Sequence, residues 1–182
     1  MKKFEIAIAV VISTGLLAVA AEMEERTIQS DRAKITISVP KDWPAIQTHH
    51  TSAGRAYYQL GPANTNHSVQ LYLNEPLPRG SNIEERIERS LAASLKPLIA
   101  SSVEGKVQFV RFGKDEDGVY ARMTDRAPKA GEFLFYTRGA RLTGTNVLGF
   151  ELVSDDKDFS ALSNTLALVE SVHVAITDNS DK

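Results

Sequence analysis

The chain has 182 residues, of which 42% are hydrophobic and 24% are charged, and its net charge is −2. This length and apolar content fit one globular domain and exclude a globally disordered chain. The balanced charge argues against a nucleic-acid-binding protein, and the absence of cysteine excludes disulfides, thiolate zinc sites and cysteine nucleophiles.

Residues 1–21 have the pattern of a secretory signal peptide. Lys2 and Lys3 precede an apolar run, and small alanines near residue 20 supply a cleavage site. An uncleaved membrane anchor is the weaker alternative, because the run is shorter than the roughly 20 residues that span a bilayer. We therefore expect a periplasmic or secreted domain with no stable membrane insertion after cleavage.

The first strands are predicted from alternation of apolar and polar side chains. Residues 33–39 alternate strictly, and Pro40 ends this strand because proline cannot donate to a sheet ladder. Residues 56–60 and 68–74 are the next predicted strands, separated by turn-forming residues.

An amphipathic helix is predicted from residue 81 or 82 to about residue 101. Its apolar side chains form one stripe, made by Ile83, Ile87, Leu91, Leu95 and Leu98. A proline inside a helix removes a hydrogen bond and clashes with the preceding turn, so Pro97 predicts a kink or an end near Leu95.

Four strands, a second helix and a closing strand follow. The strands are predicted at residues 107–112, 119–125, 132–139 and 146–154, and their short connections indicate an antiparallel meander. The helix begins after residue 156, the closing strand covers residues 172–176, and residues 177–182 are a predicted disordered tail. Together these elements predict one α+β domain over residues 22–176, an antiparallel sheet with two main helices packed on it.

The segment Ile35-x-Ile37-x-Val39-Pro40-x-x-Trp43 resembles the first strand and turn of the Mog-type/PsbP-like fold family. The order of the predicted elements is also similar over nearly the whole domain. The resemblance implies a layered sandwich that works by binding other proteins. Family members include an extrinsic subunit of the photosynthetic oxygen-evolving complex, a Ran-binding nuclear protein and bacterial envelope proteins. The family offers no shared catalytic residues to carry over.

Arginines and tyrosines of the predicted meander are the candidate binding residues. They are Tyr120, Arg122, Arg126, Tyr136, Arg138 and Arg141. We expect them to form a basic patch on the open face of the sheet, since arginine and tyrosine are enriched at protein interfaces. The alternative is a solvated sheet face whose charges pair with acidic neighbours across strands.

The histidines suggest metal binding as an alternative, but their spacing is not that of a metal site, so no metal or cofactor is predicted. His49 and His50 are adjacent, so on an extended segment they point to opposite faces, and His67 lies far along the chain. The sequence also has no nucleophile elbow, phosphate loop or dinucleotide fingerprint, so no catalytic residue is predicted.

The sequence thus predicts an exported, non-enzymatic binding or accessory protein of the cell envelope, whose partner is another protein and not a nucleic acid. An inhibitor or immunity protein for an exported toxin is a narrower hypothesis. Two alternatives stay open. One is a periplasmic protein that handles a small molecule or metal, using the three histidines or a pocket between helix and sheet. The other is an enzyme without a recognisable motif.

Overall fold

The computed structural model describes residues 22–30, 33–62, 66–74, 82–157 and 159–176. The predicted signal peptide and the predicted tail lie outside the described residues. Within these ranges no helix is long and apolar enough to cross a membrane.

The strands form two antiparallel sheets. The smaller has the order β1 (Met23–Gln29), β2 (Ala33–Pro40) and β10 (His173–Ile176). The larger has the order β3 (Gln47–His50), β4 (Ala56–Leu60), β5 (His67–Leu73), β9 (Asn146–Ser154), β8 (Phe135–Thr143), β7 (Gly118–Thr124) and β6 (Val110–Phe112). The predicted four-strand meander is confirmed as β6 to β9, paired in sequence order.

Two α-helices pack on the larger sheet, as predicted. The first, α1 (Ile83–Leu95), ends where Pro97 enters, and the chain continues as a 3₁₀-helix, η1 (Lys96–Ser101). The second, α2 (Ser160–Glu170), leads directly into β10. These findings confirm the α+β prediction and the end of the first helix near Leu95.

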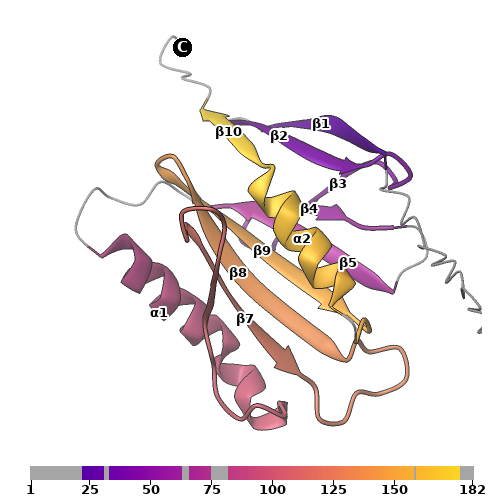
Figure 1. Cartoon of the computed structure of the whole chain (residues 1–182), viewed down its shortest axis with the longest axis vertical. Helices are drawn as coiled ribbons and strands as arrows, with labels where there is room; N and C mark the ends of the chain where they lie inside the picture. The colour runs from indigo at the N-terminus through magenta and orange to yellow at the C-terminus, as the bar shows by residue number, and fades with distance from the viewer. Residues whose placement is uncertain (1–21, 31–32, 63–65, 75–81, 158, 177–182) are drawn as a thin grey trace, which may run out of the picture.

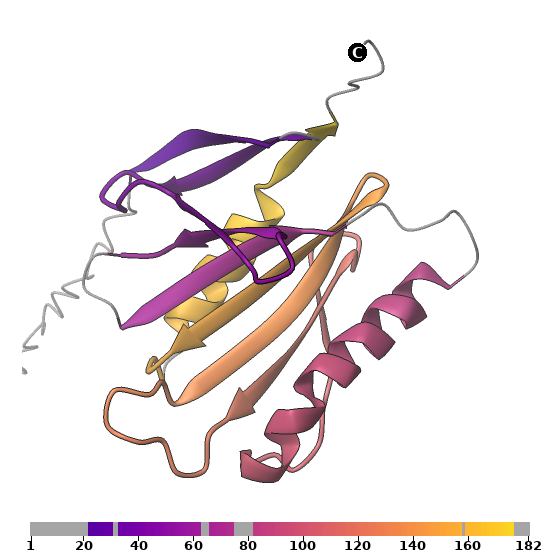
Figure 2. The same cartoon turned by 180° about the vertical axis from the view of Figure 1, so that it is seen from behind.

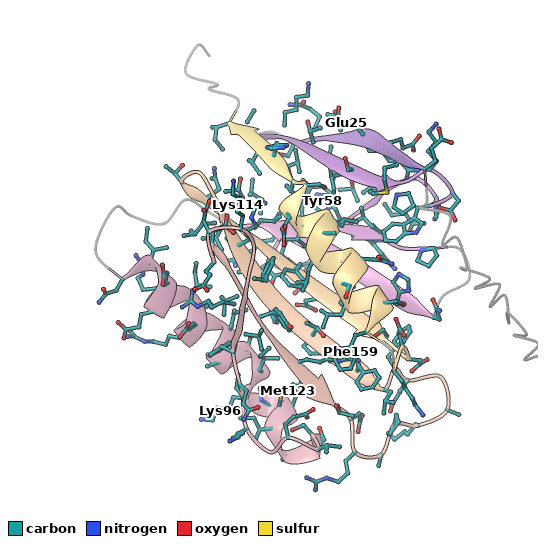
Figure 3. The ribbon with its side chains drawn as sticks, viewed as in Figure 1. Glu25, Tyr58, Lys96, Lys114, Met123 and Phe159 are labelled. Atoms are coloured by element: carbon teal, nitrogen blue, oxygen red, sulfur yellow. The ribbon has the colours of Figure 1, made fainter. Side chains whose placement is uncertain are left out.

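The helices lie on opposite faces of the larger sheet. Figure 1 shows α2 and the smaller sheet over one face, and Figure 2 shows α1 along one side of the other face. The main core lies on the α2 face, where Ile35 and Ile37 of β2 meet Leu71 of β5 and Phe150 of β9. Tyr58 belongs to this core, and Phe159 stands at the first turn of α2 (Figure 3).

Two strands were not predicted, and one was placed too early. Strand β1 is mostly polar, with Ile28 its one buried residue, and β3 is an exposed edge strand, so neither shows the usual alternation. Strand β8 runs past Gly139, which the sequence placed at a strand end. A glycine is needed inside this strand because the Phe150 ring occupies the space of a side chain there.

Candidate functional site: the groove beside helix α1

A groove exists beside α1 because one helix is too narrow to cover the larger sheet. A helix with its side chains is about 10–12 Å wide and strands lie about 4.8 Å apart, so one helix covers about two strands. Ile87 and Leu91 of α1 pack on Val119 of β7 and Ala140 of β8. Val147 at the start of β9 belongs to the same cluster, whereas the same face of the rest of β9, of β5 and of β4 is left without a helix above it (Figure 2).

The groove encloses a cavity of about 720 Å³ between α1 and this part of the sheet. Arg86, Ser90 and Ser94 line it from the helix, and Tyr72 and Glu151 line it from the sheet. A second cavity of about 540 Å³ also reaches Ser94 and continues toward η1. The second cavity has a more apolar lining, which includes Leu98, Met123, Phe133 and Tyr136.

A connected polar network forms the floor of the first cavity. Arg138 Nη1 lies 3.1 Å from Glu151 Oε1, and Arg138 Nε donates a 3.1 Å hydrogen bond to the Tyr72 hydroxyl. The guanidinium also lies 5.5 Å from the centre of the Tyr72 ring, within the range of a cation–π contact. The Tyr136 hydroxyl donates to Glu151, which completes the chain Tyr72–Arg138–Glu151–Tyr136.

The pKa values of Tyr136, Tyr72 and Arg138 are all raised within this network. Burial raises the pKa of Tyr136, and the Glu151 carboxylate raises it further. Burial also raises the pKa of Tyr72, against the opposing effect of Arg138. Burial alone would lower the pKa of Arg138, but Tyr72 and Glu151 outweigh burial, so this pKa is raised. At neutral pH the two tyrosines are therefore neutral and the arginine is charged.

A glycine in β9 shapes the floor of the first cavity. Gly149 pairs with Tyr72 across the β5–β9 register, and the Tyr72 ring lies where a Cβ atom at residue 149 would stand. The ring can therefore lie flat on the sheet, with its hydroxyl against Arg138.

Two further arginines line the groove and have no acidic partner among the described residues. Arg55 belongs to the connection between β3 and β4, and Arg86 to the first turns of α1. Both are exposed, and neither guanidinium has a hydrogen bond or ion pair with any residue in the described ranges.

The six predicted binding residues do not share one open face, so that expectation is wrong. The register pairs Arg122 of β7 with Thr137 and pairs Ala121 with Arg138. Neighbouring residues of a strand point to opposite faces, so Arg122 lies on the α2 face and Arg138 on the α1 face. Tyr136 and Arg138 belong to the floor network described above, whereas Tyr120 and Arg122 lie near each other on the α2 face.

The other four residues are used within the fold. The Arg122 guanidinium lies between the rings of Phe135 and Phe159, at 3.8 and 4.0 Å from their centres, and donates to the Asp156 carbonyl. Arg141 donates to the carbonyls of Val169 and Glu170 at the C-terminal end of α2. Tyr120 packs against Phe112, and Arg126 donates to the Ser102 carbonyl. Arg122 and Arg141 thus fasten the two ends of α2 to the sheet.

The histidines of the metal alternative are not brought together. His49 stacks on Tyr57 at 5.1 Å, whereas His67 lies 5.9 Å from Trp43, and the strand register puts His49 and His67 on opposite faces. No group of three histidine, aspartate or glutamate side chains placed to hold a metal occurs among the described residues.

No family model and no curated protein matches the sequence. The structure is similar to the solution structure of cyanobacterial PsbP (CyanoP) from Synechocystis sp. PCC 6803, with a TM-score of 0.50 at 10% sequence identity. The match covers 90% of this chain and 98% of that chain. The chain has a PsbP-like fold. At this identity the likeness shows the fold alone, and it confirms the resemblance first read from the segment around Trp43.

Sequence reasoning missed four groove residues of this PsbP-like domain: Arg55, Arg86, Tyr72 and Glu151. A signal existed for Glu151, since a single carboxylate inside the apolar run of residues 147–153 requires a charged or hydrogen-bonded partner. Arg55 and Arg86 carry no such signal, because loop and helix arginines are ordinarily solvated.

Proposed function

We propose that this chain is an exported, non-enzymatic accessory protein that works by binding, and that the groove beside α1 is its binding site. The observation that carries the proposal is a cavity of about 720 Å³ whose floor is a prearranged polar network. Such a concave site with an apolar part and a few fixed polar groups is the usual form of a ligand pocket.

The electrostatics of the floor favour binding over catalysis. A general acid or base works best with a pKa near the working pH. Here the tyrosine and arginine pKa values are raised, away from neutrality, and the Glu151 carboxylate is held by Arg138 and Tyr136. A floor of fixed polar groups of this kind can orient a bound molecule.

The cavity volume favours the small-molecule hypothesis over a protein partner. Small-molecule sites typically enclose roughly 300–1,000 Å³, and this cavity lies in that range. A partner protein, including an exported toxin, would need a contact of about 800 Å² on each side, which extends well beyond the groove. Capture of a stoichiometric polypeptide in the experiment below would restore the protein-partner hypothesis.

The test is to fill the groove with a side chain and examine what the protein carries. Ser90 is exposed on the groove wall of α1, and Ala93 is exposed on the same helix away from the cavity lining. We expect native mass spectrometry of protein purified from cells expressing the full chain to show a bound compound in the wild type and in Ala93→Trp. The compound should be absent from Ser90→Trp and chemically unchanged after incubation. An empty wild-type protein, equal occupancy in both variants, or conversion of the compound would contradict the proposal.

Export has its own test. Expression of the full chain in a bacterium should give periplasmic protein whose N-terminus is Ala21 or Glu22, as the signal-peptide pattern predicts. A chain without residues 2–21 should stay in the cytosol. Intact full-length protein in the cytosol would contradict export.

A further inference from the structure

We infer that the groove takes a small molecule that carries a carboxylate or phosphate group together with an apolar part. The inference rests on the proposed binding function and names the chemistry of its ligand. Three observations lead to it: the charge of the groove lining, the way the acidic residues of α1 are used, and the apolar side chains between the charged groups.

The groove carries more positive than negative charge. Of its described lining residues, Arg55, Arg86 and Arg138 are cationic and Glu151 is anionic. Arg138 and Glu151 neutralise each other at 3.1 Å on the floor. Among the described lining residues two positive charges are therefore left over, and their field favours an anion in the space beside them.

The acidic side chains of α1 form ion pairs with arginines that lie outside the groove. Glu85 pairs with Arg89 at 2.6 Å on the outer surface of the helix. Glu84 and Glu88 both pair with Arg111 of β6, on the side of the helix opposite β5. Arg86 is thus left without a carboxylate partner in the part of the chain that the structure describes, although it lies among three glutamates in the sequence.

Arg55 is held by its backbone, while its side chain has no partner in the described ranges. Its N–H donates to Thr51 Oγ1 at 3.1 Å, and its carbonyl accepts from the Thr51 N–H at 2.9 Å. These bonds close the turn between β3 and β4 and set the Cα of Arg55 at the groove. A free guanidinium on a fixed backbone matches the planar oxygens of a carboxylate or phosphate, which arginine binds in a forked geometry.

The rest of the lining calls for an apolar part in the same molecule. Ala56, Tyr57 and Leu73 line the cavity and are only partly buried. An inorganic anion alone would leave these side chains in contact with water, whereas an organic acid or organic phosphate would cover them.

Arginine side-chain NMR with two simple anions tests the inference. Inorganic phosphate and succinate serve as probes for the two ligand groups, with sodium chloride at equal ionic strength as the reference. We expect saturable shifts of the Arg55 and Arg86 Nε–Hε signals with at least one probe and none with chloride. The probe that binds more tightly identifies the group. No saturable shift with either probe would overturn the inference.

A control variant on the same helix makes the site assignment sharp. Arg55→Gln with Arg86→Gln should weaken probe binding at least about tenfold, because both forked contacts are lost. Arg89→Gln removes the same type of charge from the outer side of α1 and should leave binding within about twofold, as expected for a screened surface charge. Equal weakening by Arg89→Gln would mean general electrostatics and would overturn the site.

The compound that copurifies separates the two proposals. An acidic compound lost from Ser90→Trp and from the double arginine variant supports both. A neutral or cationic compound lost only from Ser90→Trp overturns the ligand chemistry and leaves the binding function intact. Binding of the probes that survives Ser90→Trp overturns the groove as the site, and with it both proposals.

Discussion

The same strands form both faces of the larger sheet, but the side chains on the two faces are buried to different extents. On the α2 face, β5 and β9 supply Val69, Leu71, Phe150 and Leu152, which are at most 1% exposed. On the α1 face the alternate residues of these strands include Gln70, Tyr72 and Glu151, which are only partly buried.

The difference follows from how completely each face is covered. Two covering layers, α2 and the smaller sheet, seal one face, and the largest cluster of buried apolar side chains stabilises the fold there through the hydrophobic effect. A single helix covers the other face, so the uncovered strands carry polar residues held in a network. Substitutions on the sealed face should therefore affect stability, and substitutions on the open face should affect binding.

The largest effect is expected from Phe150→Ala on the sealed face. Phe150 is completely buried and meets Phe112 edge-on at 5.8 Å. Loss of a buried phenylalanine side chain lowers the free energy of unfolding by about 3–5 kcal/mol. Urea denaturation should show this loss, and a change below about 1 kcal/mol would contradict the assignment of the core to this face.

Gly149→Ala should have a smaller effect that depends on Tyr72. The added methyl group meets the Tyr72 ring, and overpacking of this kind costs about 1–3 kcal/mol. In a Tyr72→Leu background the same substitution should cost clearly less, because the ring is gone. Equal costs in both backgrounds, measured by urea denaturation, would show that Tyr72 does not lie across Gly149.

The floor network predicts a loss of stability at alkaline pH. The pKa of Tyr136 is raised in the folded state by burial, so the folded chain holds this proton more tightly than the unfolded chain. Stability from this group is therefore full below pH 10, its unfolded pKa, and falls above it by at most about 1.4 kcal/mol per pH unit.

Urea denaturation at several pH values between 10 and 11.5 tests this prediction on the wild type and Tyr136→Phe. The wild-type slope with pH should be steeper, since the phenylalanine has no proton to lose. Identical slopes would show that Tyr136 titrates equally in the folded and unfolded chains.

Arg141→Gln should have a modest effect on stability and leave the groove untouched, and Arg89→Gln should have the smallest effect. Arg141 lies on the sealed face and donates to the carbonyls of Val169 and Glu170 at the end of α2. Loss of these charge-assisted bonds should cost about 1–2 kcal/mol. Arg89→Gln, which breaks only an exposed ion pair, should cost less than about 0.5 kcal/mol. If Arg141→Gln abolished ligand binding and left the free energy of unfolding unchanged, the assignment of stability to one face and binding to the other would be contradicted.

Local pattern predicted much of the fold but could not assign residues to the two faces. Alternation located β2, β5 and β9, and Pro97 located the end of α1. Period two also placed Tyr120 and Arg122 on one face, yet nothing in the pattern says that α2 covers it. The β7–β8 register sets Arg138 opposite Ala121. This register depends on the geometry of the long connection between the two strands, which the alternation of apolar and polar residues does not specify.

The candidate site was therefore predicted in part. Tyr136 and Arg138 were singled out for their residue types, and both lie on the floor network. Their partners Tyr72 and Glu151 come from strands far along the chain, and the groove itself depends on how many strands α1 leaves uncovered. Such features depend on tertiary packing, which a local pattern does not contain.

The most direct test of the account is a crystal structure of the protein with its copurified compound bound. The account predicts density in the groove beside α1, with an acidic group about 2.7–3.2 Å from the Arg55 and Arg86 guanidinium groups. Density for the compound on the α2 side of the sheet, or in the groove with a neutral group facing both arginines, would contradict it.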